Sequence, residues 1–380
     1  MAQPIQFKEP KASVLEKFGI YYLKLFRQRK LSHHVFEFSD EALRSKVMRI
    51  SVKGILLSAG IGLVCVWPTV YVDLLFQNKP PLIHYAWSYG VLAISFIIEF
   101  YILFLIALRS VHEVSELINT HAHEKDFLQA GPFNIINILS RAALQLPDPE
   151  MQILGIDPFE KVSKSNLLIL GLLYKLRIVI TNFAARFLLR VTVGISIAGV
   201  SINYIALPVE CFWNAMVILL VVKEARLRLF GFALSNHIAD KVLHDRLLGQ
   251  LSPEAKIGCL RAIGNTVVMA QNYHPNVIIL LMRFKDLLHI NKEHRYDDWN
   301  LFLECLKNVS GAERHFLRDL LTVAASFDGK ISRLESKNIG DAYGPDKEAY
   351  ITRLRLLTAH LSHGRLHAAA ALCQINFQAE

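Results

Sequence analysis

The sequence lacks the signatures of the common enzyme classes. It has no P-loop, no glycine-rich dinucleotide-binding turn, no G-x-S-x-G nucleophile elbow and no H-E-x-x-H zinc motif. Its five cysteines are scattered without C-x-x-C spacing, which argues against a disulfide framework or a cysteine-based zinc site and fits a reducing compartment. We therefore expect neither enzymatic activity nor a cofactor.

Charge is also scarce. Only 20% of the 380 residues are charged, whereas 53% are hydrophobic and are concentrated in a few segments. The net charge is +9, but no nucleic-acid-binding motif accompanies it. We interpret the bases as the cytoplasmic Lys and Arg excess of a membrane protein, and we expect membrane lipids rather than nucleic acid as partners.

Four apolar runs are present, and three of them are long enough to span a bilayer, which takes about 20 residues of helix. The runs are 54–72, 80–108, 191–209 and 211–222. The fourth has 12 uncharged residues, about 18 Å of helix. This run can span the bilayer only if the side chains of Glu210 and Lys223 reach opposite membrane–water interfaces. The sequence thus predicts an all-α integral membrane protein with two transmembrane hairpins and three or four spans.

The loops between the runs set the orientation. The loop between the first two runs holds only Lys79, and the turn between the last two holds no base. The positive-inside rule places both termini in the cytoplasm, and the polar N-terminus does not resemble a cleavable signal peptide. The predicted segments are a cytoplasmic N-terminal segment (1–52), a first hairpin (53–108), a cytoplasmic helical linker (109–189), a second hairpin (190–223) and a cytoplasmic helical domain (224–380).

Residues 17–27 read as a basic amphipathic helix with aromatic side chains on one side. Such a helix lies on an anionic membrane surface or packs on a cytoplasmic domain, and both interpretations stay open.

Several features recur in the same order along the chain, which predicts a parallel internal repeat spanning about 43–175 and 184–285. The matched pairs are Ala59-Gly60 with Ala198-Gly199, His121 with His237, Gln145-Leu146 with Gln250-Leu251, and Asn166 with Asn276.

Glu99 is the one carboxylate deep inside an apolar run. A charge near the bilayer centre costs about 3 kcal/mol or more, so it needs a partner or a function. Asn203 and Asn214 lie on the later apolar runs and are candidate partners. Glu99 is either an ion or proton site or a protonated, hydrogen-bonded packing residue.

Two groups of histidines are candidate metal ligands. One comprises His121 and His123 with Glu124; the other comprises His360, His363 and His367, spaced as on one helical face. No cysteine or aspartate completes either group at a recognised spacing. We expect solvated histidine faces near the membrane and no metal site.

Residues 324–335 match the later part of a calcium-binding EF-hand loop, but Ala324 occupies the first ligand position, so no calcium site is expected. The same residues predict a turn at Asp328-Gly329, followed by a helix that Ser332 caps and Glu335 closes as a capping box. Helical periodicity on both sides predicts a compact all-α unit over about 250–375, beginning at Ser252-Pro253-Glu254.

Residues 323–335 also resemble the turn of TerB-like (tellurite-resistance-type) helical domains, with 262–270 as an earlier helix, and the resemblance covers at most about 250–380. The dense acidic cluster of that family is absent, so metal binding does not carry over. Because such domains occur on membrane proteins with stress or envelope functions, the resemblance implies a bacterial inner-membrane setting.

Together these features predict a membrane-anchored helical scaffold or stress-response protein whose cytoplasmic helices bind protein partners. The alternatives are a small transporter or channel component that uses Glu99, and a lipid-acting enzyme at the cytoplasmic face. The sequence gives no oligomeric state.

Overall fold

The computed structural model describes residues 14–26, 37–76, 78–117, 134–144, 156, 202–242, 245–270, 273–290, 295–331, 333–373 and 375. The elements in these residues are all helices, which confirms the all-α fold class. They are α1 (Val14–Phe26), α2 (Asp40–Phe76), α3 (Pro81–Glu116), α4 (Ile135–Ala143), α6 (Ile202–His237), η3 (Ile238–Val242), α7 (Asp245–Gln250), α8 (Pro253–Ala270), α9 (Pro275–Leu287), α10 (Trp299–Asn308), α11 (Gly311–Ser326), α12 (Arg333–Tyr343), η4 (Gly344–Asp346), α13 (Lys347–His363) and α14 (Leu366–Leu372).

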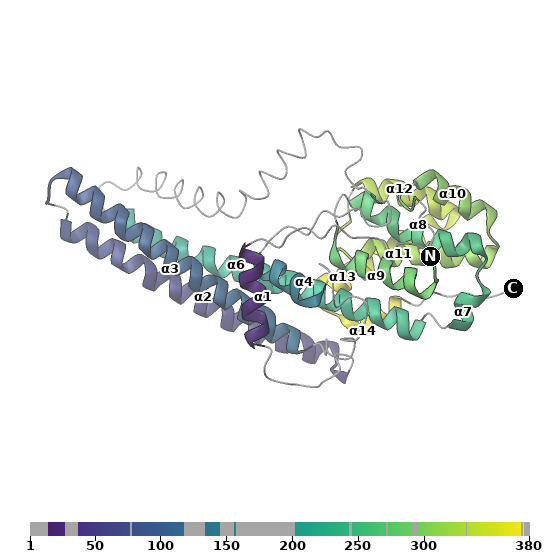
Figure 1. Cartoon of the computed structure of the whole chain (residues 1–380), viewed down its shortest axis with the longest axis horizontal. Helices are drawn as coiled ribbons and strands as arrows, with labels where there is room; N and C mark the ends of the chain where they lie inside the picture. Colours follow the sequence, from purple (N-terminus) through teal and green to yellow (C-terminus); the bar gives the residue numbers. More distant parts are fainter. Residues whose placement is uncertain are drawn as a thin grey trace, which may run out of the picture.

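Three long helices form an arm that projects from a cluster of shorter helices (Figure 1). α2 and α3 are antiparallel and join near residues 78–80, at the end of the arm farthest from the shorter helices, while α6 packs along both. α2 and α3 are long and apolar enough to cross a membrane.

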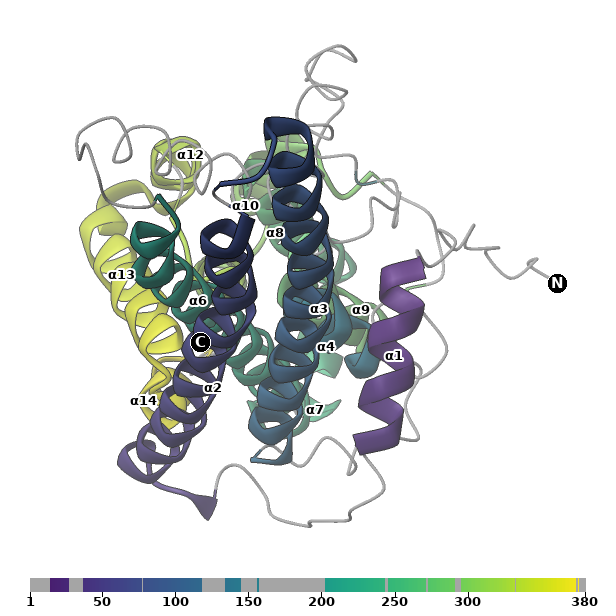
Figure 2. The same cartoon turned by 90° about the vertical axis from the view of Figure 1, so that its left-hand side faces the viewer.

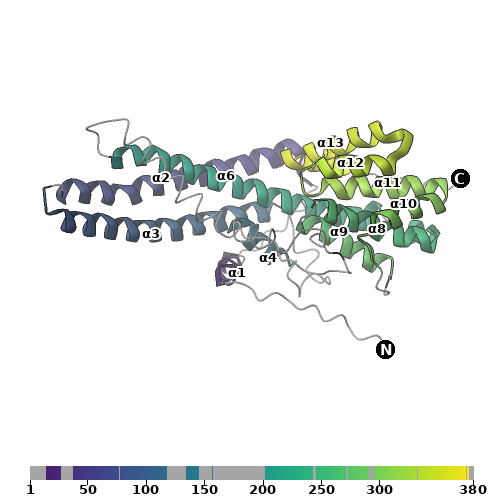
Figure 3. The same cartoon turned by 90° about the horizontal axis from the view of Figure 1, so that it is seen from above.

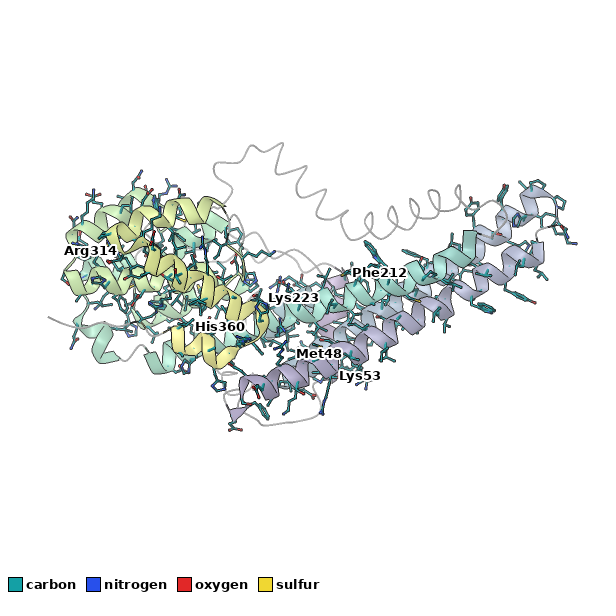
Figure 4. The ribbon with its side chains drawn as sticks, turned by 180° about the vertical axis from the view of Figure 1, so that it is seen from behind. Met48, Lys53, Phe212, Lys223, Arg314 and His360 are labelled. Carbon is teal, nitrogen blue, oxygen red and sulfur yellow. The ribbon has the colours of Figure 1, made fainter. Side chains whose placement is uncertain are left out.

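The arm has an apolar surface and polar groups in its interior. Only 22% of the most apolar stretch of α3 is buried. The exposed large side chains include Leu56, Val64, Trp67, Ile94, Ile97 and Phe212, the last of which projects from α6 in Figure 4. The buried polar side chains of the arm include Ser58, Thr69, Ser95, Glu99, Glu210 and Asn214. This distribution is the reverse of that in a water-soluble helical bundle.

α6 belongs both to the arm and to the cluster of shorter helices (Figure 3). One helix runs from Ile202 to His237. The turn predicted at Glu210 is therefore wrong, because the helix continues through that residue. The predicted boundary at residue 223 also falls inside this helix. Most of the apolar run 191–209 lies outside the described residues, so the count of three or four spans stays a prediction.

The second half of α6 forms part of the core of the C-terminal domain, a name we use for α7–α14 together with residues 224–237. Phe230 and Leu234 are fully buried against this domain, and α6 packs on α9, α13 and α14. An isolated fragment starting at residue 250 would lack this helix and would expose the apolar face of α9. The predicted autonomous unit over 250–375 therefore needs the end of α6 to complete its core.

Local sequence explains where the helices of this domain begin and end. The Ser252 hydroxyl accepts a hydrogen bond from the Ala255 amide, which confirms the predicted start of α8. Ser310 and Glu313 form a capping box at the start of α11. Gly364, with φ of 75°, ends α13.

α1 lies across the arm, beside α3 and α4 (Figure 2). Gly19 lets α1 approach α4 closely, because a Cβ there would overlap the Ser140 hydroxyl. The Tyr22 hydroxyl lies 2.9 Å from that of Tyr101 on α3. One face of α1 is thus packed on α3 and α4, while Tyr21 on another face is exposed, so both interpretations of this helix stay predictions.

The internal repeat stays a prediction. Three of its four first-copy features, at His121, Gln145 and Asn166, lie outside the described residues. The continuous helix at Glu210 removes the turn that the second copy needed to form a hairpin like that of α2 and α3.

Candidate functional site

Glu99 is buried at the centre of the arm and is held by Asn214. It is 4% exposed, and its Oε1 accepts a hydrogen bond of 2.6 Å from Asn214 Nδ2. The same amide nitrogen lies 3.4 Å from the Ser58 carbonyl oxygen on α2. The three long helices therefore meet at one polar contact. The sequence predicted Glu99 and Asn214 as partners, and this pairing is confirmed. The Asn203 side chain lies outside the described residues.

Small residues on α2 allow α6 to approach closely enough for this contact. Gly54, Ser58 and Gly62 are spaced four residues apart and lie on one face of α2. A Cβ at Gly62 would lie 2.8 Å from Asn214 Nδ2 and 3.3 Å from the backbone carbonyl carbon of Glu210. One at Gly54 would lie 2.9 Å from Ile218. Such small-xxx-small faces allow close helix packing in membranes. The spacing is visible in the sequence, but sequence analysis did not single it out.

Glu210 is a second buried carboxylate of the arm, one turn before Asn214 on α6, and is also 4% exposed. Sequence analysis treated Glu210 as an interfacial residue because it separates two apolar runs. No local signal distinguishes an interfacial charge from an interior one. The distinction depends on the face of α6 that α2 covers, which is a tertiary property.

A second polar cluster lies where α6 enters the C-terminal domain. Glu224 on α6 accepts a hydrogen bond of 2.8 Å from Arg228 Nε, and its Oε1 lies 3.8 Å from His274 Nε2. Burial raises the pKa of Glu224, but His274 and Arg228 outweigh burial and hold the pKa of this carboxyl well below its usual range. Asp328 faces the same histidine. Burial raises the pKa of Asp328, although His274 and Lys330 act in the opposite direction.

Asn276 ties the same region together through backbone contacts. Its Nδ2 donates to the Leu227 carbonyl of α6 at 3.1 Å and to the Phe327 carbonyl at the end of α11 at 3.0 Å. Gly231 provides the space, since a Cβ there would overlap the Asn276 amide. This buried amide cross-links α6, α9 and α11. Sequence analysis named Asn276 only as a repeat match and did not foresee this role.

The predicted Asp328-Gly329 turn is present. Gly329 has φ of 71°, and the Asp328 carboxylate accepts a hydrogen bond of 2.9 Å from the Lys330 amide. The turn packs on α6, because a Cβ at Gly329 would lie 2.9 Å from Leu227. Ser332 and the Glu335 side chain lie outside the described residues, so the predicted capping box is not tested.

The three C-terminal histidines do not share one helical face, and that prediction is wrong. Gly364 ends α13 immediately after His363, and His367 lies on α14. His363 Nδ1 contacts the Ala359 carbonyl at 2.7 Å, whereas His367 Nε2 contacts the Phe38 carbonyl at 2.8 Å. Among the described residues there is no group of three or more metal-ligating side chains. His121, His123 and Glu124 lie outside them.

No known protein-family model, curated protein or solved structure matches this chain. The polar contact in the arm and the cluster at the base of the domain are therefore the features from which a function can be inferred.

Proposed function

We propose that the chain is a multi-pass membrane protein of the scaffold class, with its arm in the bilayer and its shorter helices forming an adaptor domain on the cytoplasmic side. Two features of the arm support a bilayer location. Its outer face carries exposed Leu, Ile, Val and Phe side chains, and its interior carries the polar ones. In water this arrangement would expose an apolar patch far larger than soluble monomers tolerate.

The dimensions of the arm agree with this proposal. The uncharged stretch 54–72 of α2 has 19 residues, about 28 Å of helix, against a hydrocarbon core of about 30 Å. At one end of this stretch Lys53 bonds Glu113 at 2.6 Å, and Glu113 also pairs with Arg109. At the other end, aromatic rings cluster near the α2–α3 turn, where Phe76 stacks on Trp87. Such aromatic residues favour the membrane–water interface.

The Lys and Arg bias orients both termini toward the cytoplasm in this proposal. The bacterial inner-membrane setting and the stress-response role rest on the resemblance of about 250–380 to TerB-like domains. The exposed face of α1, with Tyr21, Lys17 and Lys24, is suited to the headgroup layer, because α1 lies across the arm near its domain end.

The Glu99–Asn214 contact is the observation on which we choose a scaffold over a transporter. The Glu99 carboxylate is buried and hydrogen-bonded to a helix neighbour, so it stabilises helix association where the two helices pack closely. α6 then continues without a break into the adaptor domain, so that this domain is fixed to the membrane bundle. A scaffold that presents a partner-binding domain at a defined orientation needs this rigidity.

Site-directed labelling tests the orientation. A single cysteine introduced near Lys79, in an otherwise cysteine-free chain, should react with an impermeant thiol reagent added to intact cells. A cysteine at Arg333 should react only after the cells are opened. Labelling of position 333 in intact cells would contradict the proposed topology. Loss of the protein from the membrane fraction at alkaline pH would contradict membrane integration itself.

One observation favours transport as a second candidate. Glu99 and Glu210 are both buried in the arm, and paired carboxylates in a membrane interior can carry a proton or a cation. Reconstitution in proteoliposomes distinguishes the two functions. A proton or cation flux that Glu99→Gln abolishes would support transport, whereas equal flux in protein-free and protein-containing vesicles would exclude it for the ions tested.

A further inference from the structure

α6 begins in the part of the arm that is farthest from the C-terminal domain. Leu207, near the start of this helix, packs against Val66 and Val70 in the second half of α2. Ile202 lies about 8 Å farther from the domain than Leu207, near the last residues of the uncharged stretch 54–72. In Figure 1 the start of α6 lies well along the arm, toward the α2–α3 turn. In the proposed topology residue 202 is therefore close to the outer membrane surface.

The last described residue before α6, Ile156, lies in the C-terminal domain. It is fully buried, and its carbonyl accepts a hydrogen bond of 2.9 Å from the Tyr273 hydroxyl. Its Cδ1 lies 3.1 Å from the position that a Cβ at Gly264 of α8 would take. The 45 residues from 157 to 201 therefore lead from the domain to the far part of the arm. If the arm is in the bilayer, this segment has to cross the bilayer as well.

Such a crossing has to bring positive charge into the membrane. A crossing segment is helical, because lipid cannot form hydrogen bonds with the backbone, and it needs about 20 residues. Every stretch of 20 residues within 157–201 contains at least two Lys or Arg residues. The stretch directly before α6, 182–201, contains Arg186 and Arg190 in its first half and no acid. The apolar run 191–209 is then the end of this crossing joined to the start of α6.

The arm supplies the opposite charge. Glu99 on α3 and Glu210 on α6 are both 4% exposed. By contrast, residues 54–72 of α2, 81–108 of α3 and 202–222 of α6 contain no Lys or Arg. These helices therefore bury acids without bases, and the crossing segment carries bases without acids. The two are complementary in charge.

The depths of these charges agree. Arg190 precedes residue 201 by 11 positions, about 16 Å of helix. Glu210 follows Ile202 by eight positions, about 12 Å of helix. Asn214, the hydrogen-bond partner of the other buried carboxylate, follows by 12 positions, about 18 Å. A helix that ends at residue 201 and lies antiparallel to α6 thus brings Arg190 to a level between the two carboxylates.

We propose that residues 182–201 cross the bilayer as a helix antiparallel to α6, dock on the side of the arm formed by α3 and α6, and place Arg190 beside Glu210. This inference rests on the proposed membrane location. Because α2 packs on both α3 and α6, the docked helix completes an up-down-up-down four-helix bundle on the side opposite α2. Glu210 is the partner, since Asn214 already holds the Glu99 carboxylate. An arginine and a carboxylate paired in the membrane avoid the cost that either charge would carry alone.

Labelling of intact cells tests the crossing itself. In a cysteine-free chain, Ser201→Cys should react with an impermeant thiol reagent added outside, as a cysteine near Lys79 should. Ser163→Cys should react only after the cells are opened, and its labelling in intact cells would overturn the crossing. If position 79 reacts in intact cells and position 201 does not, the membrane location stands and the crossing is wrong. If position 79 also fails to react, the proposed topology itself is wrong.

Neutral substitutions in the full-length protein test the docking. Glu210→Gln and Arg190→Gln each leave one charge without its partner. We expect each to lower the protein recovered from the membrane fraction about tenfold, because a buried charge without its partner is strongly destabilising. The double variant carries neither charge and should be recovered within about twofold of wild type. Glu210→Gln combined with Arg186→Gln is the matched control and should not restore recovery, since Arg186 lies about one turn nearer the domain.

Three outcomes would overturn the docking. Single variants recovered like wild type, or a double variant no better than the singles, would contradict the pairing of Arg190 with Glu210. Equal restoration by Arg186→Gln would show a general charge balance and contradict the assignment to Arg190. Rescue of the Glu210→Gln chain by a co-expressed Arg190→Gln chain would mean that a second copy occupies this side of the arm, because the remaining charges then pair only between chains.

Discussion

The arm and the C-terminal domain bury opposite kinds of side chain. In the domain, Phe316 and Leu320 are fully buried and Arg355 is exposed. In the arm, Glu99 and Asn214 are buried, while Leu56 and Ile97 are more than 60% exposed. Both regions satisfy their backbone hydrogen bonds within helices, so the backbone does not explain the difference. The proposed membrane location explains it: the domain excludes water from its apolar core, whereas the arm keeps its polar groups away from lipid.

The space around the glycines also differs between the two regions. The domain and its junction with α6 contain glycines that a methyl group would disrupt, such as Gly231 and Gly264. The arm contains Gly60 and Gly90, around which there is open space. Among the described glycines of the arm, only Gly54 and Gly62, on one line with Ser58, are closely packed. The arm glycines off that line should therefore tolerate substitution.

The largest expected effect is at Glu99. Glu99→Lys places a positive charge against the Asn214 amide donor, and a lysine at the bilayer centre costs about 3 kcal/mol. We expect little of this variant in the membrane fraction. Glu99→Gln keeps a hydrogen-bonding oxygen and should accumulate and melt like wild type. A Lys variant with normal yield and melting temperature would mean that Glu99 is not inside the bundle.

A matched pair of glycine substitutions should separate the two regions next. Gly231→Ala forces Asn276 away from its carbonyl acceptors and should lower the stability of the protein by about 2 kcal/mol. Gly60→Ala adds the same methyl group to a helix where nothing lies within 4 Å, and it should be neutral or stabilising by up to about 1 kcal/mol. Thermal melting of both variants in detergent measures the contrast. Equal melting temperatures would remove the distinction between the regions.

The smallest expected effect is a pH dependence confined to the junction. Glu224 has a lowered pKa, so its charge stabilises the fold above about pH 4.3, and this contribution is lost as the pH falls. Asp328 has a raised pKa, so its charge destabilises the fold at neutral pH and the penalty disappears on acidification. Glu224→Gln should therefore lower the melting temperature at pH 7, and Asp328→Asn should raise it.

The Asp328→Asn difference should shrink as the pH falls toward 4, whereas the Glu224→Gln difference should persist to about pH 4.3 and shrink only below it. Glu254→Gln is a suitable control because Glu254 is exposed on α8. If both junction variants shift the melting temperature in the same direction at pH 7, the two carboxylates do not act in opposite senses around His274.

Much of this architecture could be predicted from the sequence, because its signals are local. Long apolar runs predicted the apolar parts of α2 and α3, and Ser252 and Asp328-Gly329 predicted a helix start and a turn. Glycine after a helical pattern is also a local signal, and Gly364 could have predicted that His363 and His367 lie on different helices. The spacing of the histidines was used instead, and the resulting prediction of one helical face is wrong.

The remaining features depend on which helices meet, and no local pattern shows that. Glu210 resembles an interfacial charge until α2 covers its side of α6. Arg353 pairs with Asp319 and donates to the Leu372 carbonyl, joining α13 to α11 and α14. Asn276 needs α6 and α11 as neighbours before its side chain acquires a role. In each of these cases the decisive contact joins residues more than 30 positions apart or on separate helices.

The unbroken course of α6 has a consequence for how the length of this chain can change. Its 36 residues extend about 54 Å, and each residue added within it would turn everything beyond by about 100°. A single insertion after Lys223 would turn the rest of α6, and the domain packed on it, relative to α2. It would separate the His367 and Ala368 amides of α14 from Asp40 of α2, even if every other residue were kept. Seven added residues would nearly restore the phase but would shift the two regions apart by about 10 Å. Insertions and deletions should therefore be found in the connections between helices and not within this one.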